Sequence, residues 1–225
     1  MSDIEKGSVE VIESTSAAKR SYVPRPSTIG NPAPLGMFSF ASSTFMLSMY
    51  NAQVRGITQP NVVVGMAIWC GGIVQILAGM WEFPRNNVFG VTALTSYGAF
   101  WLSYATILIP SSGILSAYGD DTAQLQSALG IFLTTWCMFT FALCFVSIGK
   151  NITFIVLFGV LGTTLATLAS GQFFDSVAAT RAGGVMGVVV AFMAYYVGLS
   201  QLLESESHPV IRLPLGLLHT SPKKD

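Results

Sequence analysis

Long apolar runs separated by short polar breaks follow one another along most of this chain. The breaks contain proline, glycine, asparagine or charged residues, which commonly end helices. Each run is close to or above the roughly 20 residues that an α-helix needs to cross a membrane. The runs are about twice as long as a barrel strand and do not alternate polar with apolar residues, so they predict helices. We expect six spans over residues 34–53, 61–83, 87–109, 122–148, 152–170 and 182–203, with breaks at residues 55–60, 84–86, 110–121, 149–151 and 171–181.

The composition fits a chain that lies mostly in lipid. Of its 225 residues, 52% are hydrophobic and only 10% are charged, and the mean hydropathy is +0.60. A soluble domain carries about 25% charged residues. We therefore expect an all-α integral membrane protein, a bundle of six transmembrane helices in contact with the lipid bilayer.

The basic residues are divided unequally between the two sides of such a bundle. Of the 11 Lys and Arg residues, all but two lie before the first span, after the last span, or in the second and fourth breaks. Cytoplasmic segments carry the excess of Lys and Arg in membrane proteins, so both termini are expected in the cytoplasm. The residues on the terminal side are Lys6, Lys19, Arg20, Arg25, Arg85, Lys150, Arg212, Lys223 and Lys224, and those on the other side are Arg55 and Arg181.

The two ends of the chain differ from its centre. Residues 1–30 are rich in Ser, Thr and charge and contain no apolar run, which predicts a disordered cytoplasmic tail and not a signal peptide. Residues 31–203 hold the membrane domain, and residues 204–225 form a cytoplasmic C-terminal tail. The plasma membrane is the expected location, with an internal membrane such as the vacuole or endoplasmic reticulum as the alternative.

Groups that could catalyse a reaction or hold a metal are scarce. Cys70, Cys137 and Cys144 fall inside predicted spans, where a free thiol packs as a small hydrophobic residue. His208 and His219 lie in the C-terminal tail, away from any cluster of carboxylates. We expect no catalytic residues, no metal site, no cofactor and no nucleic-acid partner, and thus a protein that is not an enzyme.

Polar and small residues form a stripe along the second predicted span. Gly72, Gln75, Gly79 and Glu82 follow one another at intervals of three, four and three residues. Polar groups are costly in a membrane and usually face the bundle interior or a solute path. Gln75 and Glu82 therefore either contact a solute in turn, or Gln75 bonds a neighbouring helix and Glu82 lies at the interface beside Arg85.

Similar stripes occur on four other spans, and the one on the sixth span is a seam of small residues that allows close helix contact or subunit packing. Aromatic residues at this spacing are more often packing residues than pore residues. The stripes are Gly36, Phe40, Ser43, Leu47 and Asn51; Gly90, Leu94, Tyr97, Trp101 and Tyr104; Leu161, Thr164, Leu168 and Gln172; and Gly183, Gly187 and Ala191.

The segment at residues 31–36 opens the first span with two prolines. Proline is tolerated at a helix start. The free amides of the first turn, with Asn31, Pro32, Pro34 and Gly36 around them, could attract an anion through the helix dipole. The alternative is a rigid cap that only sets the angle at which the helix begins.

Three blocks of sequence together resemble one known family. They are residues 31–36 (NPAPLG), 71–82 (GGIVQILAGMWE) and 89–103 (FGVTALTSYGAFWLS). Their order and spacing are similar to those of the YaaH-type acetate uptake transporters of bacteria and fungi, over roughly residues 31–203. The chain departs from the common pattern at Met37, where many members have Leu, and its long N-terminal tail is typical of the fungal branch.

This resemblance implies a fold and a function. Each protomer would hold its own path through six helices, and six protomers would form a homo-oligomer, a hexamer. The partners would be acetate, related short monocarboxylates and protons, and fungal members are also linked to ammonium export. By motif matching, an apolar constriction would be formed by Phe40, Tyr97 and Leu161. Counted at 1.5 Å per residue from the starts of their helices, all three reach the bilayer midplane.

The residues themselves limit how such a solute crosses. No Lys or Arg lies inside a predicted span, so no fixed cation is available for a carboxylate. An isolated carboxylate is expensive to desolvate, so it is stabilised by hydroxyl and amide donors or it crosses protonated. Two alternatives to transport of a weak acid stay open, an ammonium path that uses aromatic faces and a membrane sensor of acetate. The candidate donors are Ser43, Asn51, Gln75, Tyr97 and Thr164, with Glu82 as a further polar contact.

Overall fold

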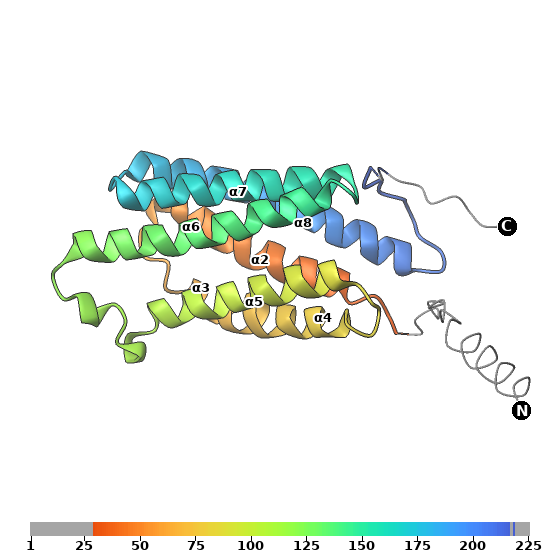
Figure 1. Cartoon of the computed structure of the whole chain (residues 1–225), viewed down its shortest axis with the longest axis horizontal. Helices are drawn as coiled ribbons and strands as arrows, with labels where there is room; N and C mark the ends of the chain where they lie inside the picture. Colours follow the sequence, from red (N-terminus) through yellow and green to blue (C-terminus); the bar gives the residue numbers. More distant parts are fainter. Residues whose placement is uncertain (1–28, 217, 219–225) are drawn as a thin grey trace, which may run out of the picture.

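The computed structural model describes residues 29–216 and residue 218, which form helices and short connections (Figure 1). The sequence prediction of an all-α fold is confirmed. The helices are α2 (Ala33–Asn51), α3 (Val63–Met66), α4 (Gln75–Trp81), α5 (Val88–Leu108), α6 (Thr122–Ser147), α7 (Ile152–Phe173) and α8 (Val177–Ser205), with a π-helical segment (Ala67–Val74) between α3 and α4 and 3₁₀ turns at Val54–Gly56, Pro110–Ser112 and Ser116–Tyr118.

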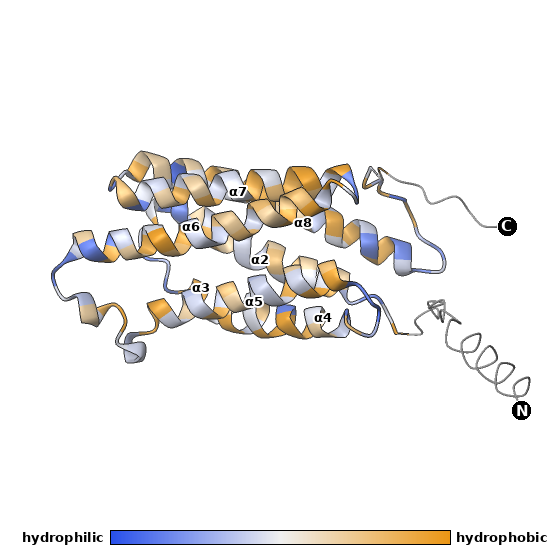
Figure 2. Ribbon diagram, viewed as in Figure 1, coloured by the Kyte–Doolittle hydropathy of each residue, from blue (hydrophilic) through white to orange (hydrophobic). Residues whose placement is uncertain are grey.

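Because α3, the π-helical segment and α4 follow one another without a break, the described chain forms six long helical rods. Apolar residues cover most of their length, and hydrophilic residues concentrate near the two ends of the bundle (Figure 2). Within the described residues, four rods pass a test of length and composition for spanning a membrane: Val63–Trp81, Thr122–Ser147, Ile152–Phe173 and Val177–Ser205. The other two, α2 and α5, are long enough but carry more Ser, Thr, Tyr and Trp side chains, many of them buried.

Side-chain caps fix the starts of four helices. Each capping side chain accepts a hydrogen bond from the backbone N–H three residues later, which satisfies a group that the helix leaves free. The caps are Asn87 with Gly90 (3.1 Å), Asp121 with Gln124 (2.9 Å), Asn151 with Phe154 (2.8 Å) and Ser176 with Ala179 (3.3 Å).

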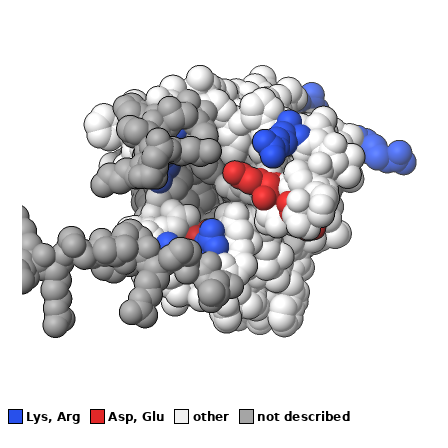
Figure 3. Space-filling model, turned by 90° about the vertical axis from the view of Figure 1, so that its right-hand side faces the viewer, with Lys and Arg blue, Asp and Glu red and all other residues white. Residues whose placement is uncertain are grey.

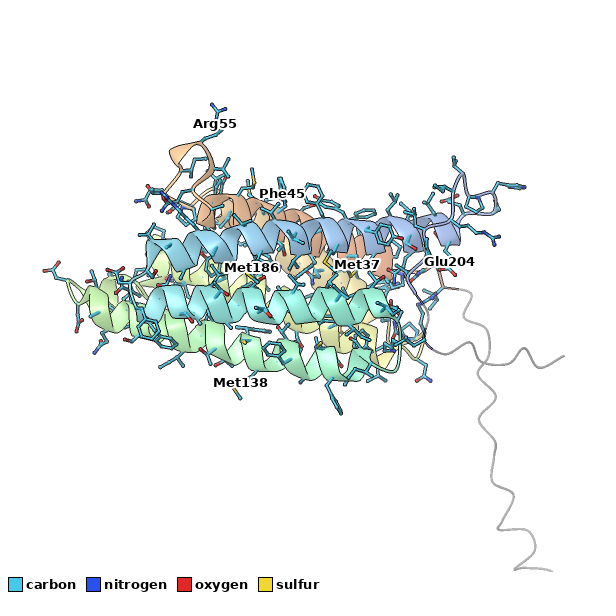
Figure 4. The ribbon with its side chains drawn as sticks, turned by 90° about the horizontal axis from the view of Figure 1, so that it is seen from above. Met37, Phe45, Arg55, Met138, Met186 and Glu204 are labelled. Carbon is cyan, nitrogen blue, oxygen red and sulfur yellow. The ribbon has the colours of Figure 1, made fainter. Side chains whose placement is uncertain are left out.

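The rods are arranged as a ring. α2 packs against α8, α8 against α7 and α7 against α6, while α2 also contacts the π-helical segment and α4, which pack on α5 (Figure 1). Side chains join α5 to α6 and complete the ring, as the hydroxyls of Tyr97 and Thr140 show at 2.9 Å. The chain enters α2 and leaves α8 at the same end of the bundle, which we call the terminal end. Arg55 lies at the opposite end from Glu204 (Figure 4), and we call it the Arg55 end.

Glycines bring α8 close to its neighbours. A methyl group at Gly184 would lie 2.7 Å from the carbonyl carbon of Asn51 and 2.8 Å from the backbone oxygen of Ser48, so α2 and α8 touch backbone to backbone. A methyl group at Gly183 would lie 2.6 Å from Leu168 on α7. The seam of small residues therefore serves close helix contact within one protomer.

The predicted break at residues 171–181 is wrong. α7 continues to Phe173 and α8 begins at Val177, so only residues 174–176 connect them. Polar residues suggested a long loop, but Ser176 caps α8 and Arg181 lies in the second turn of that helix, hydrogen-bonded to Gln53. A single arginine near the end of a helix does not break the helix when its guanidinium is hydrogen-bonded to a neighbouring side-chain amide.

Residues beyond α8 are packed over the part that the structure describes. The Ser200 hydroxyl donates to the carbonyl of Leu213 (2.6 Å), and the Tyr196 hydroxyl donates to that of Pro214 (2.7 Å). The backbone N–H of Ile152 donates to the carbonyl of Gly216 (2.9 Å), so this segment covers the start of α7. Acidic and basic side chains both appear on this end of the molecule (Figure 3). Of the expected tails, residues 1–28, 217 and 219–225 lie outside the described residues.

Substituting Gly184 with alanine tests the contact between α2 and α8. The added methyl group meets backbone atoms that cannot rotate away, so we expect Gly184→Ala to lower stability by about 1–3 kcal/mol, as overpacking does. Gly65→Ala is the matched control, because nothing lies within 4 Å of a methyl group there. The measurement is the apparent midpoint of thermal unfolding in detergent. Equal midpoints for the two variants would contradict the proposed close contact.

Candidate functional site

A cavity of about 120 Å³ lies inside the ring, between α2, α5, α6, α7 and α8. One water molecule needs roughly 10–15 Å³ of such space, so the cavity has room for several waters or a small solute. Its lining runs from Phe40, Tyr97 and Leu161 to Asn51 and Gln172, which lie close to the Arg55 end of α2 and α7. None of the lining residues is charged.

The end of the cavity that is nearer the terminal end is lined by large apolar side chains. The rings of Phe40 and Tyr97 are 5.2 Å apart between centroids, and Tyr97 stacks on Phe158 at 6.3 Å. Phe40, Tyr97 and Leu161 are 5%, 5% and 6% exposed. The Tyr97 hydroxyl pairs with Thr140, so its polar atom is satisfied within the protein. The structure thus brings the three residues from α2, α5 and α7 to the same end of one cavity.

Two walls of different chemistry extend from this end of the cavity toward the Arg55 end. Rings from α5 and α6 form the first wall, where Phe100 and Trp136 meet at 5.3 Å between centroids. Hydroxyl and amide groups from α2, α7 and α8 form the second. A small solute with one polar and one apolar end would fit between them. The aromatic wall contains Phe100, Trp101, Tyr104, Phe132 and Trp136, and the polar wall contains Thr44, Ser48, Asn51, Thr164, Gln172 and Thr180.

Of the polar contacts predicted from sequence, Asn51 and Thr164 line the cavity and three others do not. Ser43 faces the second rod, where its hydroxyl donates to the carbonyl of Met66 at 3.4 Å. Gln75 is fully buried, and neither polar atom of its side-chain amide has a partner among the described residues.

The α6 residues Phe132 and Trp136 line the cavity but were not identified from the sequence. They are four residues apart and so form a helical stripe of the kind used for the other spans.

The third residue outside the cavity, Glu82, lies at the terminal end. It is 1% exposed, and its Oε2 lies 3.4 Å from Nε of Arg85. Arg85 also donates to the carbonyl of Ile29 at 2.9 Å. A methyl group at Gly90 would lie 3.2 Å from the Glu82 carboxyl carbon, so the carboxylate rests against the first turn of α5. The positive end of a helix favours an anion there.

The NPAPLG segment begins α2 with most of its first amides already used. Asn31 Oδ1 accepts from the N–H of Ala33 (3.2 Å), and the N–H of Gly36 donates to the carbonyl of Pro32 (3.2 Å). Pro34 has no N–H. A methyl group at Gly36 would lie 2.7 Å from Leu94 of α5, so this glycine permits close packing. These contacts favour a rigid cap over an anion site.

Comparison with known proteins identifies close relatives. A family model described as the GPR1/FUN34/yaaH family matches residues 15–217. "Ammonia transport outward protein 2" of Saccharomyces cerevisiae is 47% identical, over 83% of this chain and 66% of its own length. "Acetate permease A" of Emericella nidulans is 38% identical, over 85% and 67%. This chain thus spans about two thirds of each fungal relative.

Bacterial relatives match over nearly their whole length. "Succinate-acetate/proton symporter SatP" of Escherichia coli is 34% identical, over 85% of this chain and 97% of its own. The solved structure of the bacterial acetate channel SatP superposes with a TM-score of 0.73 at 30% identity. That match covers 83% of this chain and 100% of the solved one.

Removing Arg85 tests the buried ion pair. Arg85→Met leaves the Glu82 carboxylate without its cation, and we expect a loss of roughly 1–3 kcal/mol. This is below the 3–5 kcal/mol typical of fully buried pairs, because the Arg85 side chain is 28% exposed. Adding Glu82→Gln to that variant should restore part of the loss. The measurement is the apparent unfolding midpoint in detergent, with exposed Arg212→Met as the control. Additive losses from the two changes would argue against a coupled pair.

Proposed function

Because this chain belongs to the GPR1/FUN34/yaaH family, we propose that it transports acetate and related short monocarboxylates across a membrane, together with protons. The names of its relatives, an acetate permease, a succinate-acetate/proton symporter and an acetate channel, support this substrate class. They are transporter names, and none of them describes an enzyme.

The observation that carries the proposal is the uncharged cavity with two unlike walls. Acetate has a methyl group that suits aromatic rings and an oxygen-bearing group that suits hydroxyl and amide side chains. A cavity of about 120 Å³ is small enough to prefer short acids. Since none of its lining residues is charged, a carboxylate would enter without a fixed counter-ion, which favours passage as the neutral acid or with a proton.

Phe40, Tyr97 and Leu161 are the proposed constriction. A ring of apolar side chains in a narrow path repels water, so a solute passes only after it sheds its hydration shell. The neutral acid sheds water at a far lower cost than the carboxylate does. Asn51 and Thr164 are the proposed polar contacts, and Ser43, Gln75 and Glu82 have supporting roles outside the cavity.

The proposed membrane topology follows from the distribution of the basic residues between the two ends of the bundle. We place both termini in the cytoplasm, because Arg85, Lys150 and Arg212 lie at the terminal end and Arg55 and Arg181 lie at the other. The plasma membrane is the proposed location. A homo-oligomer, a hexamer, is proposed from the family resemblance alone.

Ammonium transport is the second candidate, and the aromatic wall of the cavity favours it. A cation can be held over ring faces such as those of Trp101 and Trp136, and the yeast relative is named for outward ammonia transport. A membrane protein that senses acetate without moving it is a further alternative. Charge selectivity distinguishes these functions, since an ammonium path would not respond to acetate.

Uptake of labelled acetate into liposomes that contain the purified protein tests the proposal. We expect uptake to be stimulated by an inward proton gradient and to be faster at acidic than at neutral external pH, at a fixed acetate anion concentration. Phe40→Ala should raise the rate severalfold and weaken the preference for acetate over larger acids, because it widens the constriction. Phe45→Ala is the control, since Phe45 packs on Phe192 and lies outside the cavity.

Uptake that was independent of pH and of the proton gradient would contradict proton linkage. No acetate uptake by a well-folded parent protein would contradict the acetate function. The same vesicles, given an outward ammonium gradient, would then decide between ammonium transport and sensing.

A further inference from the structure

The hydroxyl group of Tyr97 is bonded to a residue that does not line the cavity. Its oxygen lies 2.9 Å from Oγ1 of Thr140 on α6. Tyr97 belongs to the cavity lining, whereas Thr140 does not. Thr140 is 0% exposed and Tyr97 is 5% exposed, so bulk water does not compete for this contact. The Tyr97 hydroxyl is therefore directed at the packed region between α5 and α6.

A second hydrogen bond determines which of the two hydroxyls is the donor. Oγ1 of Thr140 also lies 2.7 Å from the backbone carbonyl oxygen of Trp136. A carbonyl can only accept, so Thr140 donates the proton of its hydroxyl to Trp136. Both contacts are then hydrogen bonds only if the Tyr97 hydroxyl donates to Thr140. The proton of Tyr97 is thus bound inside the protein.

Aromatic rings from three helices also pack on Tyr97. The distances between ring centroids are 5.2 Å to Phe40 of α2, 6.3 Å to Phe158 of α7, and 6.3 Å and 5.8 Å to Trp136 and Phe139 of α6. These contacts support the ring but give the hydroxyl no oxygen or nitrogen partner. Within the part of the chain that the structure describes, Thr140 supplies that partner.

Building on the transport function proposed above, we propose that Thr140 is a positioning residue of the constriction. Because it accepts the Tyr97 proton, the ring of Tyr97 borders the path and its hydrogen-bond donor does not. A carboxylate needs donors to replace its hydration, whereas an undissociated short acid loses far less on leaving water. Thr140 thereby makes the constriction favour the neutral form of a short monocarboxylic acid without touching the solute.

Thr140→Val tests this role, because valine is close to threonine in shape and cannot accept a hydrogen bond. The Tyr97 hydroxyl then lacks a partner, and since a buried hydroxyl is costly to leave unpaired, it turns to the solute or to water in the path. The maximal rate of labelled acetate uptake and the half-saturating concentration should both fall roughly three- to tenfold, the effect of one added hydrogen bond that retains the solute.

Conservative exchanges at the same position refine the test. Thr140→Ser keeps the acceptor and should restore the parental rate and half-saturation. Thr140→Cys offers sulfur, a weak acceptor, and should give a smaller change in the same direction as Thr140→Val. Thr135→Val is the matched control on α6, since Thr135 is exposed and its hydroxyl bonds the carbonyl of Ile131 at 3.0 Å.

Tyr97→Phe separates positioning from packing. In that background there is no hydroxyl to release, so adding Thr140→Val should change neither kinetic parameter further. A residue that only packs would instead give the same loss in both backgrounds, because independent effects add. Equal effects of Thr140→Val in the two backgrounds would therefore overturn the proposed role.

Proton leak into liposomes without any added acid is a readout that does not depend on acetate transport. A free hydroxyl admits water to an apolar constriction, so Thr140→Val vesicles should acidify severalfold faster than parental ones under an inward proton gradient. Tyr97→Phe should abolish this difference. Such a leak would support the positioning role even if the parent failed to move acetate, in which case the transport function alone would be wrong. Parental kinetics together with a parental leak in Thr140→Val would overturn the role.

Discussion

Backbone contact between α2 and α8 determines the shape of the interior. At Gly184 there is no room for even a methyl group between the two helices, so one face of α2 is committed to α8. A second face meets the second rod, where Ser43 and Gly71 come together. The face that remains carries Phe40 and Thr44 and is the one that borders the cavity. The glycines of α8 therefore determine which face of α2, with its polar and aromatic side chains, borders the cavity.

The opposite side of the ring is held in a different way. α5 and α6 approach each other through large side chains and make few close backbone contacts. Tyr97 lies at the centre of this seam, bonded to Thr140 and surrounded by the rings of Trp136 and Phe139. Glycine contacts make one half of the ring rigid, whereas the half that carries the aromatic wall depends on ring packing. The proposed constriction thus lies where the half packed through glycines meets the half packed through large side chains.

Most of the fold could be predicted from sequence, because long apolar runs leave few alternatives to membrane helices. The site could be predicted only in part. Phe40, Tyr97 and Leu161 all line one cavity, but periodicity could not tell which polar residue faces the cavity and which faces a neighbouring helix. Gln75 is the clearest case, since it shares the stripe of Gly72 and Gly79 yet lies outside the cavity.

The π-helical segment and the segment after α8 were not foreseen, for related reasons. A π-helical turn has no distinctive sequence pattern, and here it brings Gly71 onto the indole of Trp101. The residues beyond α8 were expected to form a cytoplasmic tail, but the hydroxyls of Tyr196 and Ser200 donate hydrogen bonds to the carbonyls of Pro214 and Leu213. Both features depend on contacts between parts of the chain that are distant in sequence.

The proposed constriction and the rest of the cavity differ in one physical respect, the polar side chains that line them. At the level of Phe40 and Tyr97, the Tyr97 hydroxyl is satisfied by Thr140, so this polar atom is not available to a solute. Closer to the Arg55 end of the same cavity, Ser48 and Asn51 of α2 belong to its lining. A solute that sheds water at an apolar constriction regains polar neighbours only after it has passed. Under the transport function proposed here, this order of apolar and polar lining favours passage over retention at the constriction.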